Sequence, residues 1–132
     1  MKNILLVEDA KEVYQMVLES VSGMGELHWA KSITEASDLI SKNDYNLLIL
    51  DIELPDGNGI DLCRNIQRTH SKVPVFFLTG HNNLDEKSKA FTSGADTYIT
   101  KPFTPKELRD RILSFDETEE NMELLGMFLK LK

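Results

Sequence analysis

The sequence predicts an α/β protein built on a doubly wound, five-stranded parallel sheet. Short apolar runs alternate with amphipathic segments five times along the 132 residues, which indicates βαβ units with helices on both faces of one sheet. The run at 47–50, Leu-Leu-Ile-Leu, has no polar alternation, as is typical of a parallel strand covered on both faces. The length is enough for one domain with a real hydrophobic core.

The first half of the chain supplies two strands and two helices before this central run. Residues 3–7 are apolar and predict a strand, and 10–21 repeat valines and a methionine at helical spacing. Two glycines then end the helix, and 26–30 alternate weakly as a second strand. Ser32, with a glutamate three residues later, fits a capping box that opens a helix over 33–42.

The second half repeats the same alternation. Apolar spacing predicts a helix over 60–69, and the apolar run 73–78 predicts a strand that tolerates a proline near its start. Residues 84–93 read as a mostly polar helix with a thin apolar stripe, and 96–100 as the last strand. A threonine cap, a proline in the first turn and a capping-box acid open a final helix over 104–115.

Composition excludes several classes of protein. The net charge is -7 and the pI about 4.9, with no stripe of Lys and Arg, so we expect no direct nucleic-acid binding. No apolar run approaches the roughly 20 residues that a membrane span needs, and the N-terminal residues have no signal-peptide pattern. The one cysteine, Cys63, is expected to fill the core. We therefore expect a cytoplasmic protein with no membrane partner.

Polar residues stand at the ends of four predicted strands. Because parallel strands end at the same edge of a sheet, these residues should converge: Glu8, Asp9, Asp51, Thr79 and Lys101. Three clustered carboxylates repel one another, which raises the pKa of at least one unless a cation is present. Oxygen ligands without a nearby His or Cys favour a hard ion, so we expect Mg²⁺ as cofactor.

This set of groups suits phosphoryl chemistry. A carboxylate such as Asp51 can attack phosphorus and form an aspartyl phosphate. Lys101 and the metal would neutralise phosphoryl oxygens, and the hydroxyl of Thr79 could donate to another. The added negative charge changes the local field, to which mobile neighbours can respond. These residues therefore outline a switch.

Four motifs resemble the receiver domain of bacterial two-component response regulators over about residues 2–115. They are Glu8-Asp9, D-I-E-L-P-D-G-N-G from Asp51, V-P-V-F-F-L-T-G, and S-G-A-D-T-Y-I-T-K-P-F-T-P-K-E-L. The resemblance implies a flavodoxin-like (βα)5 fold with strand order 2-1-3-4-5. It implies that Asp51 is the phosphoacceptor, that Asp9 binds Mg²⁺ directly and Glu8 through water, and that the backbone carbonyl of Glu53 completes the metal site.

The same resemblance implies a switch pair and a phosphate contact. Thr79 and Tyr98 are similar to the coupled residues in which the hydroxyl moves toward phosphate while the ring turns inward. Lys101 would contact the phosphoryl group. Pro102 is expected to follow a cis peptide bond, which proline alone makes cheap.

One residue departs from the family pattern, and two others occupy positions that vary within it. Gly80 stands where the family most often has alanine, so the loop after Thr79 should be looser. Glu53 and His81 occupy positions that bias how fast the phosphoryl group is lost. Whether these two side chains pair over the site or hinder incoming water is left open by the sequence.

The resemblance also implies partners and an output. A histidine kinase or a histidine phosphotransfer protein would donate the phosphoryl group. The chain would then signal to a downstream protein or self-dimer through the face of the fourth helix (84–93), the fifth strand (96–100) and the fifth helix (104–115). It would be a signalling domain that assists its own phosphorylation and dephosphorylation, not an enzyme.

Two other functions stay open. A phosphohydrolase with an aspartyl nucleophile generally has a second Asp two residues after the first, but that position is Glu53. A phosphorylation-independent interaction module is the other, and the intact acidic pair, Asp51 and Lys101 argue against it.

The last 17 residues extend beyond the usual end of this family. We expect a receiver domain over 1–115 and a C-terminal amphipathic helix or linker over 116–132. Five acids come first and two lysines last, the polarity that a helix dipole favours, with Met122, Leu125 and Leu129 on one stripe. This helix would cover its own domain or, as we slightly prefer, a partner or second copy.

Overall fold

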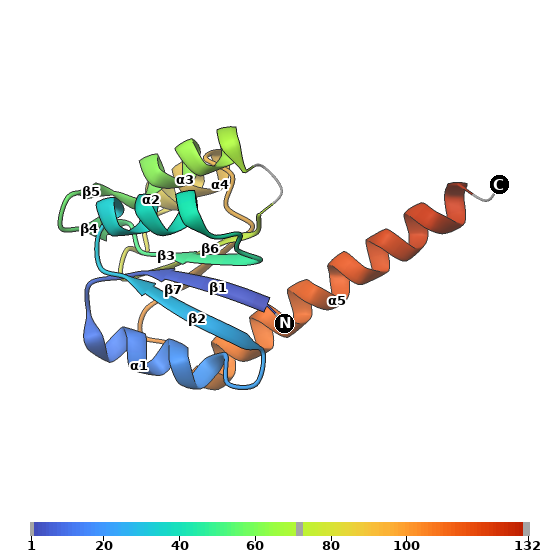
Figure 1. The fold of residues 1–132 in the computed structure, drawn as a ribbon, viewed down its shortest axis with the longest axis horizontal. Coiled ribbons are helices and arrows are strands. Elements are labelled where there is room, and N and C mark those ends of the chain that lie inside the picture. Colours follow the sequence, from blue (N-terminus) through green and yellow to red (C-terminus); the bar gives the residue numbers. More distant parts are fainter. Residues whose placement is uncertain (1, 71–72, 131–132) are drawn as a thin grey trace.

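The computed structural model describes residues 2–70 and 73–130, and a five-stranded parallel sheet forms its centre (Figure 1). The strand order is β2-β1-β3-β6-β7. All neighbouring strands in this sheet run parallel, and the order is the predicted 2-1-3-4-5 once these five strands are counted alone. The strands are β1 (Lys2–Val7), β2 (Gly25–Ala30), β3 (Leu47–Leu50), β6 (Val75–Thr79) and β7 (Thr97–Thr100).

Five helices cover the two faces of the sheet. They are α1 (Lys11–Ser20), α2 (Ile33–Lys42), α3 (Gly59–Thr69), α4 (Leu84–Thr92) and α5 (Pro105–Lys130). Figure 1 shows α2, α3 and α4 on one face and α1 with the first part of α5 on the other. The predicted doubly wound α/β fold is confirmed, and the predicted helix bounds differ by one residue or so except at the end of α5.

Alternate side chains of each central strand point into two separate apolar layers. In β1, Leu5 and Val7 pack with α2, α3 and α4, whereas Ile4 and Leu6 pack with α1 and α5. All four are buried. Burying one such side chain stabilises the fold by about 1.5–3 kcal/mol. A strand covered on both faces buries its side chains on both, so it stabilises the fold more than a strand with one face in solvent. Cys63 is also fully buried in the first layer, as predicted for a core residue.

Side chains cap the helices where the sequence predicts. Ser32 Oγ accepts a hydrogen bond from Glu35 N (3.1 Å), and Thr104 Oγ1 accepts one from Glu107 N (3.1 Å). The carboxylate of Glu35 reaches back one residue further than in a capping box, because it accepts from Lys31 N (2.6 Å). Both predicted helix caps are therefore confirmed. The difference is that the Glu35 carboxylate binds the backbone N–H of Lys31 and not that of the cap residue Ser32.

The segment after Asp51 is more ordered than the shaped loop that the sequence predicts. Two short strands, β4 (Glu53–Leu54) and β5 (Gly57–Asn58), pair antiparallel in a hairpin. At its tip, Asp56 accepts hydrogen bonds from Ile33 N (2.8 Å) and Thr34 N (3.0 Å), which ties the hairpin to the start of α2. The segment that follows β3 is thus held against α2 by Asp56.

Gly59, the first residue of α3, lies against the backbone of Asp51, which follows β3. A Cβ built at Gly59 would overlap the backbone carbonyl of Asp51. We expect Gly59→Ala to lower the free energy of unfolding by about 1–3 kcal/mol, measured by urea denaturation, because backbone must move to make room. A Cβ at Gly80 meets nothing within 4 Å, so Gly80→Ala is the matched control and should not destabilise. Equal losses in both variants would contradict the close approach.

Helix α5 does not end near residue 115 but runs without a break to Lys130. Its first part is held on the body: Arg109 donates to the carbonyls of Ser20 (3.2 Å) and Ser22 (2.8 Å), and Phe115 packs edge-on against Phe76. Beyond that, the helix projects away from the sheet (Figure 1). The domain boundary at 115 stays a prediction. Within residues 2–70 and 73–130, every helix is too short or too polar to cross a membrane.

Candidate functional site

The ends of β1, β3, β6 and β7 meet at one edge of the sheet, and the predicted polar residues gather there. Parallel register places Val7 beside Leu50 and Thr79 beside Thr100, so the residues that follow each strand lie next to one another. A cleft of about 400 Å³ opens at this edge. Its lining residues are Asp51, Glu53, Gly80, His81 and Lys101.

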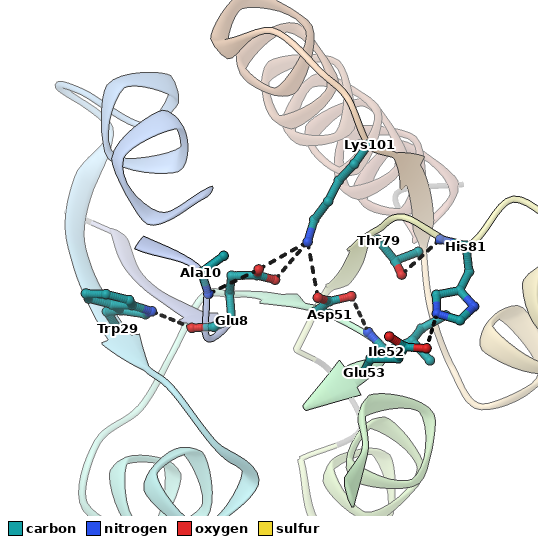
Figure 2. Close-up of polar contacts among 9 residues, drawn as sticks. All are labelled: Glu8, Ala10, Trp29, Asp51, Ile52, Glu53, Thr79, His81 and Lys101. Atoms are coloured by element: carbon teal, nitrogen blue, oxygen red, sulfur yellow. Dashed lines mark hydrogen bonds and ion pairs between the residues drawn. The ribbon is translucent and has the colours of Figure 1, made fainter. Parts of the chain in front are cut away.

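Lys101 links the two buried carboxylates of this edge (Figure 2). Its Nζ lies 3.1 Å from Asp51 Oδ2 and 3.1 Å from both carboxylate oxygens of Glu8. Asp51 is 7% exposed and Glu8 only 2%. Asp51 Oδ1 also accepts a hydrogen bond from Ile52 N (2.7 Å), which leaves its Oδ2 oriented toward Lys101. The Lys101–Pro102 peptide bond is cis, as the resemblance to receiver domains implies.

The acidic groups are crowded, as their convergence at strand ends predicts. Oxygens of Glu8, Asp9 and Asp51 lie within 4.8 Å of one another. Burial, together with the neighbouring Asp51 carboxylate, raises the pKa of Glu8 to about 7. Burial lowers the pKa of Lys101, but the Asp51 and Glu8 carboxylates outweigh it, so that pKa is raised overall. One lysine therefore does not neutralise the group, which fits an additional hard cation.

Thr79 is the last residue of β6, and Tyr98 lies in the neighbouring strand β7. Thr79 is fully buried, and its Oγ1 accepts a long hydrogen bond from His81 N (3.4 Å). Tyr98 is 6% exposed, so its ring is turned inward, and its hydroxyl donates to the carbonyl oxygen of His81 (2.6 Å). The loop after Thr79 is thus held between both members of the expected switch pair. Gly80, between Thr79 and His81, has free space where a Cβ would lie.

His81 bridges two carboxylates from different elements. Its Nε2 lies 2.8 Å from Glu53 Oε1 in β4, and its Nδ1 lies 2.7 Å from Glu86 Oε2 in α4. Burial lowers the pKa of His81, but the bond to Glu53 and the charge of Glu86 outweigh it and raise the pKa overall. The structure therefore answers the open question of whether His81 and Glu53 pair: they do, beside the mouth of the cleft.

Two residues that contact this site were not found from the sequence. The Trp29 indole donates to the backbone carbonyl of Glu8 (2.6 Å), and its ring stacks on Tyr14 with centroids 4.2 Å apart. Glu86, in the first turn of α4, has a carboxylate oxygen 2.7 Å from His81 Nδ1. Neither carries a local signal, because both contacts depend on which elements lie side by side.

Fold and site together define a doubly wound α/β domain with a cluster of carboxylates and one lysine at the C-terminal edge of its sheet. A model of the family described as the response regulator receiver domain matches residues 4–113. The chain belongs to this family, whose members are phosphoacceptor signalling domains of two-component systems.

Curated relatives agree with this assignment. The chain is 36% identical over 112 residues to the uncharacterized transcriptional regulatory protein YrkP of Bacillus subtilis, covering 84% of this chain and 48% of YrkP. It is 36% identical over 110 residues to the cell cycle transcriptional regulator CtrA of Caulobacter vibrioides, covering 83% and 48%. The chain thus spans about half the length of these relatives.

Solved structures are also similar. The non-phosphorylated HemR receiver domain from Leptospira biflexa has a TM-score of 0.80 at 36% identity, covering 86% of this chain and 93% of that one. A BeF3-activated DrrB receiver domain has a TM-score of 0.83 at 31% identity, covering 89% and 98%. DrrB is a Thermotoga maritima response regulator.

Proposed function

We propose that this receiver domain is a Mg²⁺-dependent phosphoacceptor that takes its phosphoryl group from a phosphohistidine in the cytoplasm. The donor is a histidine kinase or a histidine phosphotransfer protein. The observation that carries the proposal is the position of Asp51: a nearly buried carboxylate at the cleft, with one oxygen 3.1 Å from the Lys101 ammonium. Neither a solvated strand-end residue nor a structural ion pair requires an open cleft at that point.

The residues that would hold the metal fit a hard divalent ion. Asp9 is exposed at the rim and can meet a hydrated ion, whereas Glu8 is buried behind it and would act through water. Asp51 and the backbone carbonyl of Glu53 complete an all-oxygen donor set. When bound, Mg²⁺ would offset carboxylate charge and polarise phosphoryl oxygens.

In the transfer step, an Asp51 oxygen attacks phosphorus while the bond from phosphorus to the donor imidazole nitrogen breaks. The electron pair of that bond leaves on the imidazole, which is protonated as it departs. Lys101 contributes positive charge to the phosphoryl oxygens, and the Thr79 hydroxyl donates to another of them. The product is an aspartyl phosphate on Asp51.

The switch that we propose passes through the loop between β6 and α4. When Thr79 moves toward the phosphoryl group, the backbone at His81 moves with it, and the inward state of Tyr98 changes through its bond to the His81 carbonyl. This loop leads into α4, where Leu84 is 82% and Phe91 46% exposed. The face of α4, β7 and the first part of α5 would then present a different surface to a downstream protein or a second copy.

The function is tested by incubating the protein with acetyl phosphate and measuring its intact mass. We expect one phosphoryl adduct with Mg²⁺ and none when EDTA replaces the metal. Loss of the adduct in mild base, which cleaves acyl phosphates, separates it from a phosphate on Ser or Thr. An adduct that forms equally well in EDTA would contradict the metal requirement.

Removing the His81 side chain should shorten the life of the aspartyl phosphate. In the structure, the paired His81 and Glu53 side chains stand at the cleft through which water must approach Asp51. We expect His81→Ala to speed dephosphorylation severalfold, measured by the decay of the adduct after acetyl phosphate is removed. His70, an exposed residue at the end of α3 that does not line this cleft, provides the control His70→Ala, which should decay as wild type does. A slower decay in His81→Ala would mean that the imidazole assists water.

A further inference from the structure

The part of α5 beyond the body of the domain carries an exposed apolar segment. The last described contact with the sheet is made by Asp116, whose carboxylate contacts Lys2 Nζ. Further along, large apolar side chains face solvent: Met122 is 66% exposed, Leu124 62%, Leu125 57%, Met127 63% and Leu129 60%. A helix with this much exposed apolar surface needs a covering partner.

The charges of this segment are divided along its length. Its first half holds five acids, and its last residues hold two lysines; these are Asp116, Glu117, Glu119, Glu120, Glu123, Lys130 and Lys132. Two copies aligned in parallel would bring the acidic half of one segment beside the acidic half of the other. Two copies aligned antiparallel place Lys130 of each copy beside Glu117 of the other, so opposite charges meet at both ends of the pair only in this direction.

The apolar residues favour the same direction. Thr118, Met122, Leu125 and Leu129 follow one another at spacings of four, three and four, which forms one stripe on a helix. In an antiparallel pair, Met122 of each copy can face Leu125 of the other while Thr118 faces Leu129. This alignment places apolar residues opposite apolar residues at the centre of the pair. It also places Lys130 of each copy opposite the acidic half of the other.

We propose that two copies of this chain pair antiparallel through residues 117–130 of α5. The pairing is symmetric, with the same stripe used by both copies. Because α5 projects away from the sheet (Figure 1), antiparallel pairing would place the two receiver bodies at opposite ends of the paired helices. The pairing requires no phosphate, so it is independent of the phosphoacceptor function. Because the paired segment is short, we expect a weak dimer that must be sought at high protein concentration.

Sedimentation equilibrium tests the pairing with a matched pair of variants. Leu125→Glu puts a charge into the stripe and should weaken the dimer at least tenfold. Leu124→Glu makes the same change at an equally exposed residue outside the stripe and should leave most of the dimer. Wild-type protein that stays monomeric, or equal effects of the two changes, overturns the proposal. Circular dichroism and adduct formation with acetyl phosphate should be unchanged in both variants, which shows that the domain is intact.

Disulfide trapping tests the direction. Thr118→Cys and Leu129→Cys variants, which differ in mass, are mixed in equal amounts and oxidised; the native Cys63 is buried and does not take part. Antiparallel pairing should give mainly the mixed disulfide between the two variants. Parallel pairing would give mainly the two homodimers, and that result overturns the proposed direction.

Discussion

An Asp51→Asn variant is expected to form no phosphoryl adduct with acetyl phosphate and Mg²⁺ under conditions that modify the wild-type protein. The amide oxygen of asparagine is a poor nucleophile and a weak metal ligand, so both the attack on phosphorus and the metal site are lost. Intact mass measurement gives the result directly. The change replaces a carboxylate by an isosteric amide, so the fold should be retained.

The matched control for this variant is Asp61→Asn, at an exposed residue in the first turn of α3. It makes the same chemical change away from the cleft and should accept phosphate as wild type does. An adduct that survives in Asp51→Asn would move the phosphoacceptor to another residue and remove the basis of the proposed function.

Replacing Lys101 with alanine should slow adduct formation by about 10²-fold, the loss typical of removing one preorganised charge or donor from a transition state. In the structure, Lys101 Nζ lies 3.1 Å from the Asp51 oxygen, close to where phosphoryl oxygens would stand. Its removal also leaves Glu8 and Asp51 without their shared cation. The rate is measured by intact mass over time at saturating Mg²⁺ and acetyl phosphate.

Lys106→Ala is the control for this change. Lys106 is an exposed lysine in the first turn of α5 that pairs with Asp110 (2.6 Å) and does not line the cleft. We expect its adduct to form at the wild-type rate. Urea denaturation of both variants separates a loss of chemistry from a loss of fold. An unchanged rate in folded Lys101→Ala would show that the metal alone stabilises the transferring group.

His81 gives the site a connection that the sequence pattern alone did not reveal. Its ring joins Glu53 beside the acidic centre to Glu86 in α4, and its backbone carbonyl accepts the hydroxyl of Tyr98. One residue therefore touches the cleft, the helix and the ring of the proposed switch. The residue whose substitution is predicted to change the phosphoryl lifetime therefore also contacts α4.

Local pattern was enough for most of the fold. The unbroken apolar run at 47–50 identified a strand covered on both faces, and the Ser32 and Thr104 caps marked two helix starts. These features depend on residues within one or two turns of one another. The hairpin of β4 and β5 was missed because each strand has only two residues, too few to show a period.

The site was also largely predictable, because a parallel sheet brings every strand end to one edge. Asp51, Thr79 and Lys101 could be placed together before any contact was known, as could Glu8 and Asp9. The extended α5 was not foreseen as one helix, because the boundary at 115 was taken from the usual end of the family. The acidic residues after Phe115 form neither a cap nor a break, and the helix continues through them.

The sequence by itself determined the order of strands and helices along the chain, the acidic strand ends and the identity of the candidate phosphoacceptor. Only the tertiary structure decided that His81 pairs with Glu53 and Glu86, that Trp29 binds the backbone of Glu8, and that Tyr98 is turned inward. The physical reason is the distance along the chain between the residues that interact. Periodicity and capping follow from neighbours along the chain, whereas these side-chain contacts follow from the register and spacing of elements that only the packed core brings together.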